Sequence, residues 1–440
     1  MLDTVLFRDV TIVSSAGMRT GDVFVENGKI AEVEPHCHRD AELVIHETGL
    51  HLFPGVIDPH VHFRDPGAEW KEDLESGSRA AAAGGVTTFF DMPNTKPATT
   101  TIDRMVEKKA LASQKSIVNY NFFIGATDAN LDDLVAVENV PGIKIYVGSS
   151  TGSLLVDQMR DLERIFAETK HLIAVHSEDE VTIKRNLERY SGSSDVLDHL
   201  NIRSPDAAII CTRKLVKLAE AHKHPLHICH LTTAEEALFL SGHPSRKWVT
   251  TEVSPQHLLL SAPGVYEAIG TYAQINPPIR EKRHADALWT ALKNNEIQLV
   301  ATDHAPHTRE EKDQAFPKAP SGMPGIETSF PLMLTLASHG DCSYEEVVKW
   351  MSEQPASVFG VKGKGHISVG MDADLVLVDL KGTAVIENDK LFTKCKWSAF
   401  SGQTTVGRPI ATFVHGQLVF REGEVFSDIK GKEADIKPRT

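Results

Sequence analysis

The sequence predicts an α/β protein: a (β/α)8 barrel of the TIM type with a small β-sandwich domain built from both termini. Through the middle of the chain, short apolar runs alternate with longer segments of helical spacing. Alternating β patterns occupy both ends, and the 440 residues exceed the roughly 250 that a barrel needs. A doubly wound open sheet is the alternative, but the chain has no GxGxxG phosphate turn to support it.

The β patterns at the two ends share one design. DVFVENGKIAEVE places Asn27-Gly28 between alternating apolar residues, and ATFVHGQLVFREGEVF repeats this around His415-Gly416. Asp372–Leu380 predicts a further strand. Neither end is long enough to close a sheet alone, so we expect residues 1–52 and 366–440 to form one composite β-sandwich domain around a catalytic barrel of residues 53–365. We expect the charged tail after about Lys430 to be loose.

Eight apolar runs predict the barrel strands. They are FPGVIDPHVH, VTTFFDMPN, VNYNFFIGA, GIKIYVG, LIAVHSED, LHICHLT, WVTTEV and IQLVATDH. Segments with helical spacing separate most of them, for example residues 153–169 and 204–221. The second begins at a plausible cap, Ser204, with Pro205 at the first helical position.

Most of these runs end in chemically capable side chains, and in a barrel all carboxyl ends of the strands open on one face. Side chains two apart on a strand point the same way, so the imidazoles of His60 and His62 can reach one point. Four strand-end imidazoles and one carboxylate are too many ligands for one tetrahedral zinc with an open position. This number suits two metals that share a bridging ligand. The candidate residues at strand ends are His60, His62, Arg64, Asn94, Lys144, His176, His230 and Asp303.

Two cations close together need anionic ligands between them. Lys144 becomes a candidate if carbon dioxide carboxylates it, because the product has two oxygens and a negative charge. The alternative is a strand-end lysine that points to solvent. His227 and His304 face away from the ligands by strand alternation and are expected to be structural, whereas His307 can return to the pocket.

Composition narrows the function classes. The net charge of −14 and the lack of a basic block argue against a nucleic-acid surface. No apolar run approaches the ~18 residues of a membrane span, and the first residues lack a signal-peptide pattern. Five scattered cysteines fit reduced thiols, so we expect a cytoplasmic protein.

Several motifs together resemble the dihydroorotases of the amidohydrolase superfamily. These motifs are DPHVHFRDPG (58–67), DMPNTKP (91–97), NPPIR (276–280), TDHAPH (302–307) and GKGHISVGMDADLVLVDL (363–380). The resemblance implies reversible cyclisation of N-carbamoyl-L-aspartate to L-dihydroorotate and water, a step of pyrimidine (UMP) synthesis. It implies a homo-oligomer, a dimer, and possible association with aspartate transcarbamoylase.

The resemblance also assigns residues. Positions matching the metal site are His60, His62, Lys144, His176, His230 and Asp303; positions matching substrate contacts are Arg64, Asn94, Asn276, His307, Ser321 and Gly322. It implies two divalent ions, expected to be Zn²⁺, with Lys144 N6-carboxylated. Many dihydroorotases of this size carry an aspartate after the fourth strand, but IYVGSSTG has no carboxylate there, and GIKIYVG looks like the branch that uses a carboxylated lysine.

These residue types suit the implied chemistry. Metals lower the pKa of a bridging water to about 7, which gives a hydroxide that attacks the ring amide. Asp303 serves as general acid and base, and the planar fork of Arg64 suits the substrate α-carboxylate. An ion pair of Arg64 with Asp65 or Asp73 is the structural alternative. Residues 308–325 are expected to form a lid or wall of the pocket, or a solvated loop.

Two other functions remain open from the sequence. Allantoinases and dihydropyrimidinases are cyclic amidohydrolases with the same metals and a different specificity pocket. A catalytically inactive homologue that acts as an assembly partner is the alternative from another class, although such scaffolds typically lose metal ligands and here every candidate position is filled.

Overall fold

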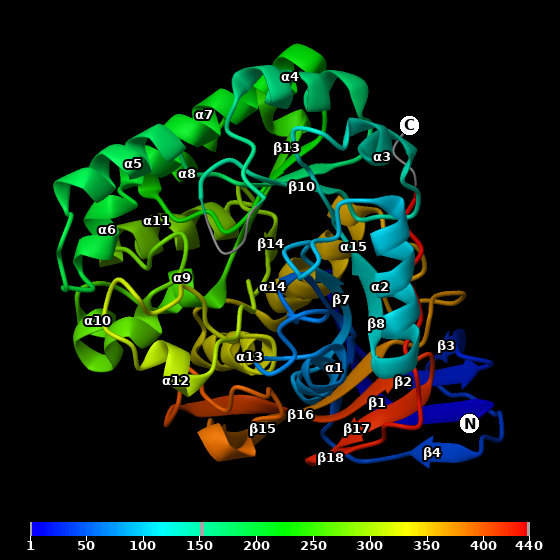
Figure 1. Ribbon diagram of the computed structural model, residues 1–440. Helices are drawn as coiled ribbons and strands as arrows, with labels where there is room; N and C mark the ends of the chain where they lie inside the picture. Colours follow the sequence, from blue (N-terminus) through cyan, green and yellow to red (C-terminus); the bar gives the residue numbers. More distant parts are fainter. Residues whose placement is uncertain (1, 150–153, 438–440) are drawn as a thin grey trace.

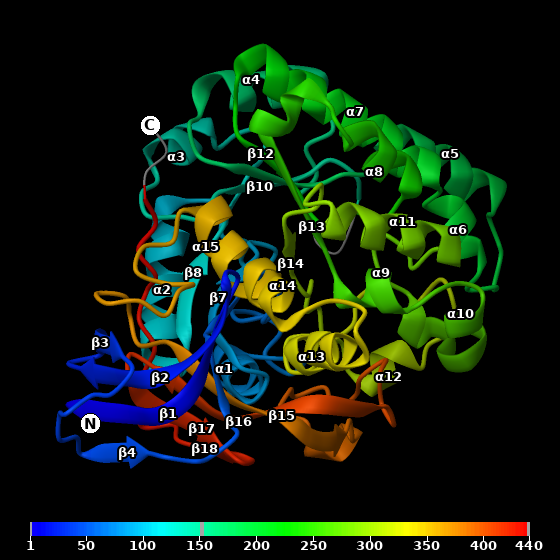
Figure 2. The same ribbon diagram turned by 180° about the vertical axis from the view of Figure 1, so that it is seen from behind.

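The computed structural model describes residues 2–149 and 154–437. It consists of a parallel barrel, covered by helices on its outer side, and a sheet that packs against one side of it (Figures 1 and 2). The predicted fold class is therefore confirmed. None of the helices in the described ranges is long and apolar enough to cross a membrane.

The barrel strands coincide with the eight apolar runs of the sequence. They are β6 (Val56–Val61), β7 (Val86–Asp91), β8 (Asn119–Phe122) with β9 (Ile124–Gly125), β10 (Ile143–Tyr146), β11 (Ile173–His176), β12 (Leu226–Ile228), β13 (Val249–Val253) and β14 (Leu299–Val300). Hydrogen bonding runs β6-β7-β8 and β9-β10-β11-β12-β13-β14, and β8 and β9 are two halves of one run interrupted at Phe123. A parallel bridge between Val61 and His304 brings the last strand beside the first and closes the ring.

Helices follow most of the barrel strands, as the apolar spacing predicts. Their bounds are α1 (Leu74–Ala83), α2 (Ile102–Lys115), α3 (Leu131–Ala136), α4 (Met159–Glu168), α5 (Glu180–Arg189), α6 (Asp198–Ile202), α7 (Pro205–His222), α8 (Ala234–Leu240), α9 (Pro255–Leu259), α10 (Gly264–Ile269), α11 (Lys282–Lys293), α12 (Arg309–Lys312), α13 (Ser329–His339), α14 (Tyr344–Val348) and α15 (Gln354–Phe359). In the part of the chain that the structure describes, four short helical turns complete them: η1 (Pro244–Lys247), η2 (Gly270–Ala273), η3 (Lys349–Glu353) and η4 (Asn388–Lys390).

Two details of the helix prediction differ. Helix α7 begins at Pro205 as expected, but the Ser204 side chain makes no capping hydrogen bond. In the segment 153–169, Ser153 lies outside the described residues and α4 begins only at Met159. The described residues before it are not helical, and Leu155 forms a parallel bridge with Tyr146 at the end of β10. Pairing with a buried barrel strand thus replaces the first turns of the predicted helix.

Both chain ends build one nine-stranded sheet. Its strands are β1 (Thr4–Ser14), β2 (Gly17–Glu26), β3 (Lys29–Glu34), β4 (Leu43–Ile45), β5 (His51–Pro54), β15 (Leu375–Val385), β16 (Thr404–Val414), β17 (Gln417–Arg421) and β18 (Glu424–Val425). Strand β5 joins the halves, because it pairs with β1 on one side and with β15 on the other. The amide of Ile30 bonds to the carbonyl of Met371, which ties the outer strand β3 back to the segment before β15, so the sheet curls on itself.

The hairpin turns and the core follow from the sequence pattern. Asn27-Gly28 and His415-Gly416 have positive φ at both positions, as a two-residue turn of this kind requires. Phe7 and Phe413, from opposite ends of the chain, pack edge to face with ring centroids 5.0 Å apart. Burial of each such ring stabilises the sheet by roughly 1.5–3 kcal/mol.

The expectation of a loose tail after Lys430 is wrong for the described residues. Ala434 is 1% exposed, and its amide donates to the carbonyl of Tyr120 in β8. The side-chain amide of Asn121 donates to the carbonyl of Ala434 at 2.8 Å. The backbone of the tail thus pairs with a barrel strand, which its charged composition did not indicate.

Candidate metal centre

A narrow cavity opens where the barrel strands end. Its lining comprises His60, His62, Arg64, Asn94, Lys144, Tyr146, His176, His230, Asn276, Asp303, Ala305, Ser321 and Gly322. Strands β6, β10 and β11 carry His60, Lys144 and His176, while His230 and Asp303 follow β12 and β14. The barrel therefore brings together residues from His60 to Gly322, which lie far apart in the sequence. Eleven of the twelve site residues predicted from the sequence line this cavity.

Asp303 lies at the centre of the imidazoles. Its Oδ1 is 3.0 Å from His62 Nε2 and 3.3 Å from His60 Nε2. On the opposite wall, His176 Nδ1 is 3.1 Å from His230 Nε2. All four histidines are buried. Each ring thus presents one nitrogen toward the same small space, as ligands of a shared ion do.

The other ring nitrogens of three histidines have fixed partners. His62 Nδ1 is 2.7 Å from Asn94 Oδ1, and His176 Nε2 is 2.8 Å from Glu178 Oε2. His60 Nδ1 contacts the carboxylate of Glu252. Carboxylate and amide partners of this kind orient an imidazole and hold it in one tautomer, which is the usual support of a metal-binding histidine.

Glu178 and Glu252 are functional candidates that the sequence did not identify. Both are fully or almost fully buried, and Glu252 also contacts His227 Nε2 at 3.0 Å and accepts from the His230 amide at 3.1 Å. The signal was available, because an ionisable residue inside an apolar strand such as WVTTEV needs a buried partner. His227 therefore lies outside the ligand set, as strand alternation predicts.

Lys144 is fully buried, so the alternative of a solvent-facing lysine is wrong. Its Nζ lies 3.0 Å from Cys229 Sγ and 5.2 Å from the ring centroid of Tyr146. In the described part of the chain, no carboxylate oxygen lies within the 4.0 Å ion-pair distance of this nitrogen. A buried ammonium without an anionic partner is costly, so the burial of Lys144 needs a chemical explanation.

Arg64 reaches the cavity without an ion pair. Asp65 pairs instead with Lys115 at 2.7 Å, and Asp73 pairs with Lys394, so neither predicted structural partner holds Arg64. The Nε of Arg64 donates to the carbonyl of Pro306 at 3.2 Å, and Nη2 lies 3.3 Å from His307 Nε2. Among residues 2–149 and 154–437 no carboxylate oxygen lies within the 4.0 Å ion-pair distance of this buried guanidinium. Asp303 and Asp91 are the carboxylates that interact with it at longer range.

His307 is the one predicted site residue outside the lining. Its Nε2 lies 3.1 Å from the carbonyl of Ser321, and its Nδ1 lies 3.1 Å from Lys71 Nζ. The ring therefore stands behind Arg64 and connects that side chain to the loop that contains Ser321. His307 thus contacts Arg64 but does not line the cavity itself, and its predicted contact with substrate stays a prediction.

Part of the segment 308–325 forms a wall of the cavity. Lys312 is fully buried, and its Nζ donates to the carbonyls of Gln274 and Pro320 at 3.1 and 2.8 Å. Gly322 has φ +144°, and a Cβ there would lie 2.5 Å from the Ala305 carbonyl oxygen, so only glycine fits. Asn276 lies nearby, with its buried Oδ1 unpaired within the described residues. The prediction of a wall therefore holds for residues 319–325, whereas Arg309, Glu310 and most of residues 313–318 are exposed to solvent.

Burial and mutual attraction set the protonation of the site. Burial alone raises the pKa of Asp303, but the nearby imidazoles outweigh it and hold that pKa well below its ordinary value. Burial lowers the pKa of His62 to about 4 and, with His176 beside it, holds the pKa of His230 well below normal. His62 and His230 are therefore neutral and Asp303 is ionised, which are protonation states that ligate metals. His60 differs, because burial lowers its pKa but the carboxylates of Glu252 and Asp303 outweigh burial and raise that pKa to about 10.

The donor set fits a divalent metal. Ligand atoms of His60, His230 and Asp303 all lie within 4.8 Å of one another, and a second group of this kind joins His60, Cys229 and Glu252. His230 Nδ1 is buried without a hydrogen-bond partner among the described residues. Nitrogen and oxygen ligands of this type suit zinc, cobalt and manganese.

Comparison with known proteins agrees with this geometry. The model of the amidohydrolase family matches residues 51–419. The chain is similar to the dihydroorotase of Halobacterium salinarum, with 39% identity over 93% of this chain and 98% of that protein. It is also similar to the dihydroorotase of Methanothermobacter thermautotrophicus, with 36% identity over 92% of both chains.

Solved structures with a similar fold include a hydantoinase and a dihydropyrimidinase. The L-hydantoinase (dihydropyrimidinase) from Arthrobacter aurescens superimposes with a TM-score of 0.93 at 29% identity, covering 99% of this chain and all of that one. The dihydropyrimidinase from Brevibacillus agri gives a TM-score of 0.92 at 26% identity over 99% of both chains. The barrel and the terminal sheet therefore occur together in these proteins.

Proposed function

Because the chain belongs to the amidohydrolase family, we propose that it is a dihydroorotase, which reversibly cyclises N-carbamoyl-L-aspartate to L-dihydroorotate and water in pyrimidine synthesis. The observation that carries this choice is Arg64, a buried guanidinium at the cavity without a carboxylate partner in the described ranges. The substrate's α-carboxylate fits it through two charge-assisted hydrogen bonds. A neutral hydantoin or dihydrouracil ring has no group that matches.

We propose that His60, His62, Lys144, His176, His230 and Asp303 hold two divalent ions, expected to be Zn²⁺. Such ions activate water and polarise a carbonyl at neutral pH. Carboxylation of Lys144 at Nζ replaces an unpaired buried ammonium with an anion, which two neighbouring cations require. Glu252, Glu178 and Asn94 hold the outer nitrogens of the histidines and thereby fix the rings.

In the synthetic direction Asp303 accepts the proton of the ureido nitrogen as this nitrogen attacks the side-chain carboxylate of the substrate. In the hydrolytic direction Asp303 returns a proton to the departing nitrogen. Its central position and depressed pKa keep it ionised and ready to accept. Arg64 binds the α-carboxylate, with His307 behind it, while Asn94, Asn276, Ser321 and Gly322 complete the substrate pocket.

The remaining proposals concern the domain boundaries, the oligomeric state, the protein partner and the cellular location. Residues 53–365 form the catalytic barrel, and residues 1–52 with 366–440 form the supporting domain. We also propose a homodimer, association with aspartate transcarbamoylase and a cytoplasmic location. All five cysteines are buried and free, which supports a reducing compartment.

A substrate panel tests the proposal. Purified protein loaded with Zn²⁺ is assayed with L-dihydroorotate, allantoin and dihydrouracil, and we expect turnover of L-dihydroorotate only. The similarity to dihydropyrimidinase structures makes dihydrouracil the informative competitor. Turnover of only allantoin or dihydrouracil contradicts the assignment, and inactivity on all three favours the assembly-partner alternative.

Two further measurements test the metal site directly. Prolonged chelation is expected to abolish activity and to remove about two zinc ions per chain by elemental analysis. An intact mass obtained under gentle conditions should exceed that of the acid-treated protein by about 44 Da, the mass of one carbon dioxide bound as a carbamate. A His60→Ala variant with wild-type turnover excludes the metal hypothesis.

A further inference from the structure

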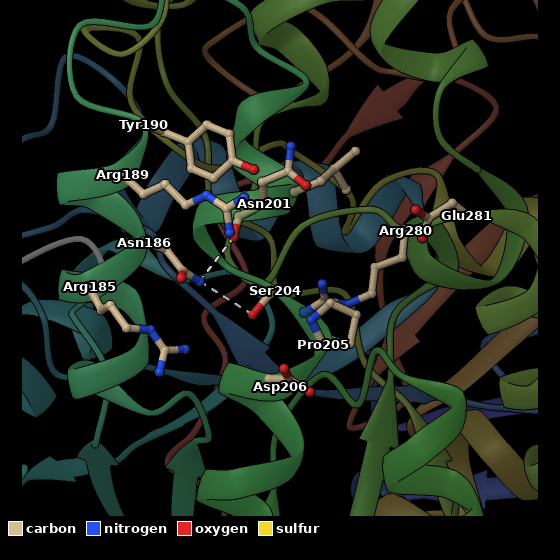
Figure 3. Close-up of a pocket in the computed structure, with 11 residues that line it drawn as sticks. Arg185, Asn186, Arg189, Tyr190, Asn201, Ser204, Pro205, Asp206, Arg280 and Glu281 are labelled. Carbon is tan, nitrogen blue, oxygen red and sulfur yellow. Dashed lines mark hydrogen bonds between the residues drawn. The ribbon is translucent and has the colours of Figure 1, made fainter.

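A second cavity of about 430 Å³ lies outside the candidate metal centre (Figure 3). Its walls come from helices α5 and α6, the first turn of α7 and the segment before α11. None of its lining residues belongs to the candidate metal centre. Volumes of this size hold small organic ligands. The lining consists of Arg185, Asn186, Arg189, Tyr190, Leu200, Asn201, Ser204, Pro205, Asp206, Arg280 and Glu281.

Arg280 is the strongest indication of a ligand. The side chain is 4% exposed, its Nη1 donates to the carbonyl of Arg203 at 2.9 Å, and its Nε donates to Thr232 Oγ1 at 3.2 Å. Nη2 is buried and has no hydrogen-bond partner in the described residues. Figure 3 shows the guanidinium extending toward Ser204 and Pro205 at the start of α7. A buried charged donor without an acceptor is costly, and an anion in the cavity supplies the acceptor.

Two more guanidinium groups stand on the facing wall. Arg185 and Arg189, one helical turn apart on α5, project toward the cavity from the side opposite Arg280 (Figure 3). Neither has a carboxylate within the 4.0 Å ion-pair distance in the part of the chain that the structure describes. By contrast, Lys184 on the same helix pairs with Glu180 at 3.3 Å. The two arginines are therefore available to an anion.

The start of α7 adds to this positive potential. The helix runs from Pro205 to His222, and the side chain of Ser204 makes no cap hydrogen bond to its first amides. Asn186 instead reaches Ser204 Oγ at 3.4 Å and the carbonyl of Asn201 at 3.0 Å, which holds the loop beside the helix end. First-turn amides and the helix dipole favour negative charge at this position.

Two carboxylates in the lining narrow the class of ligand. Glu281 lies 3.5 Å from His284 Nε2, whereas Asp206 is exposed at the start of α7. Three guanidinium groups against two carboxylates leave a net positive cavity. An occupant with an anionic group for the arginines, and hydroxyl or amino donors near Asp206, matches both kinds of residue.

We propose that this cavity binds a small organic dianion, either a phosphate monoester or a dicarboxylate, at a site separate from the catalytic cavity. A short chain of side-chain contacts connects this cavity to the candidate metal centre. Arg203, whose carbonyl accepts from Arg280, pairs through its guanidinium with Glu178, and Glu178 holds His176. The proposal rests on the arginines and the cavity, and it does not depend on the reaction assigned to the metal centre.

Calorimetric titration of the zinc-loaded protein tests the site. The probes are inorganic phosphate, AMP and malonate, and comparison of the three identifies a phosphate, nucleotide or carboxylate ligand. The variant Arg185→Gln/Arg189→Gln removes two exposed charges from the wall, and we expect it to weaken the binding of the preferred anion about tenfold or more. The matched control Lys184→Gln removes a charge from the same helix but does not line the cavity, and it should change the affinity less than about twofold.

Two outcomes of the titration would overturn the proposal. Equal affinity of the wild-type protein and the double variant places the anion elsewhere, for instance beside Arg64. An absence of binding by all three anions up to about 10 mM excludes a functional anion site in this cavity. Circular dichroism of the double variant verifies that a loss of binding does not come from unfolding.

Discussion

Residues with positive φ occur both at the barrel cavity and in the terminal sheet, but for different reasons. In the sheet, positive φ values at Asn27 and His415 belong to two-residue hairpin turns whose geometry calls for them. At the cavity, Arg64, His230 and Asp303 have φ values of +61°, +35° and +47°, although none lies in such a hairpin. Backbone conformations of this kind cost about 1 kcal/mol or more each and occur where the surrounding structure enforces them.

The two regions also differ in how many ionisable side chains they bury. The sheet core joins Phe7, Phe413 and other apolar side chains from both termini, and it needs no chemistry to justify its composition. The cavity concentrates histidines, a lysine, an arginine and carboxylates that are buried at a cost in free energy. The contrast teaches that the sheet contributes stability, while the carboxyl end of the barrel gives up stability to hold reactive groups.

The largest expected effect is on activity, from Asp303. Asp303→Asn keeps the size of the side chain but removes the proton acceptor at the centre of the imidazoles, so kcat/KM should fall about 10³-fold. Steady-state kinetics with L-dihydroorotate measures this, and circular dichroism should show an unchanged fold. The control Asp389→Asn alters a carboxylate whose side chain is 98% exposed, and it should keep full activity. Turnover of the Asp303 variant within twofold of wild type contradicts the role.

The complementary change lies in the sheet. Phe413→Ala empties a site at which the ring is fully buried against Phe7, and it should lower the free energy of unfolding by about 3–5 kcal/mol. Urea unfolding measures the loss, and kcat of the folded protein should not change. Val385→Ala at the 48% exposed end of β15 is the control and should cost far less. A large drop in kcat for Phe413→Ala shows that the two regions are not independent.

Arg64 offers a test of substrate specificity. Arg64→Gln removes the charge proposed to bind the α-carboxylate, and KM for L-dihydroorotate should rise about 100-fold while kcat changes little. Arg160→Gln removes a charge from a side chain that is 84% exposed and should leave both constants unchanged. An Arg64 variant whose kcat falls while KM stays constant points to a role in the chemical step instead.

The features that could be predicted from the sequence depend on short-range geometry. Strand alternation is enough to place His60 and His62 on one face, and parallel strands carry every strand-end residue to one side of the barrel. Asn27-Gly28 sets its own hairpin, because the turn type depends on these two residues. The fold class and the gathering of the candidate ligands follow from these local rules.

The features that could not be predicted depend on contacts between distant segments. Glu252 meets His60 across 192 positions, and Cys229 meets Lys144 across 85, so no local pattern reveals either pair. His307 contacts Arg64 and Lys71 across more than 230 positions, and no local pattern reveals these contacts either. The tail was expected to be loose because its pairing partner, Tyr120, lies more than 300 positions earlier.

The smallest expected effect concerns the boundary between the two regions. Glu327 accepts from the backbone amides of Phe392 and Thr393, and burial raises its pKa to about 8. An unfolded glutamate titrates near 4.5, so between about pH 4.5 and 8 the folded state keeps a proton that the unfolded state loses. This group therefore makes stability fall as the pH rises through that window, which is opposite to the effect of an ion-paired carboxylate.

Glu327→Gln keeps an acceptor for these amides and cannot ionise, so it should remove this part of the pH dependence. Because the side chain of Glu327 is partly exposed, solvent screening reduces the effect. The variant should be more stable than wild type at pH 8 by about 1–2 kcal/mol, and the difference should be much smaller at pH 5. Urea unfolding at both pH values measures the difference. Glu345→Gln, on helix α14, is a control that should shift neither value. If the Glu327 variant is destabilised equally at both pH values, the prediction is wrong. The ionised carboxylate is then needed for its contacts, and its burial does not lower the free energy of unfolding at high pH.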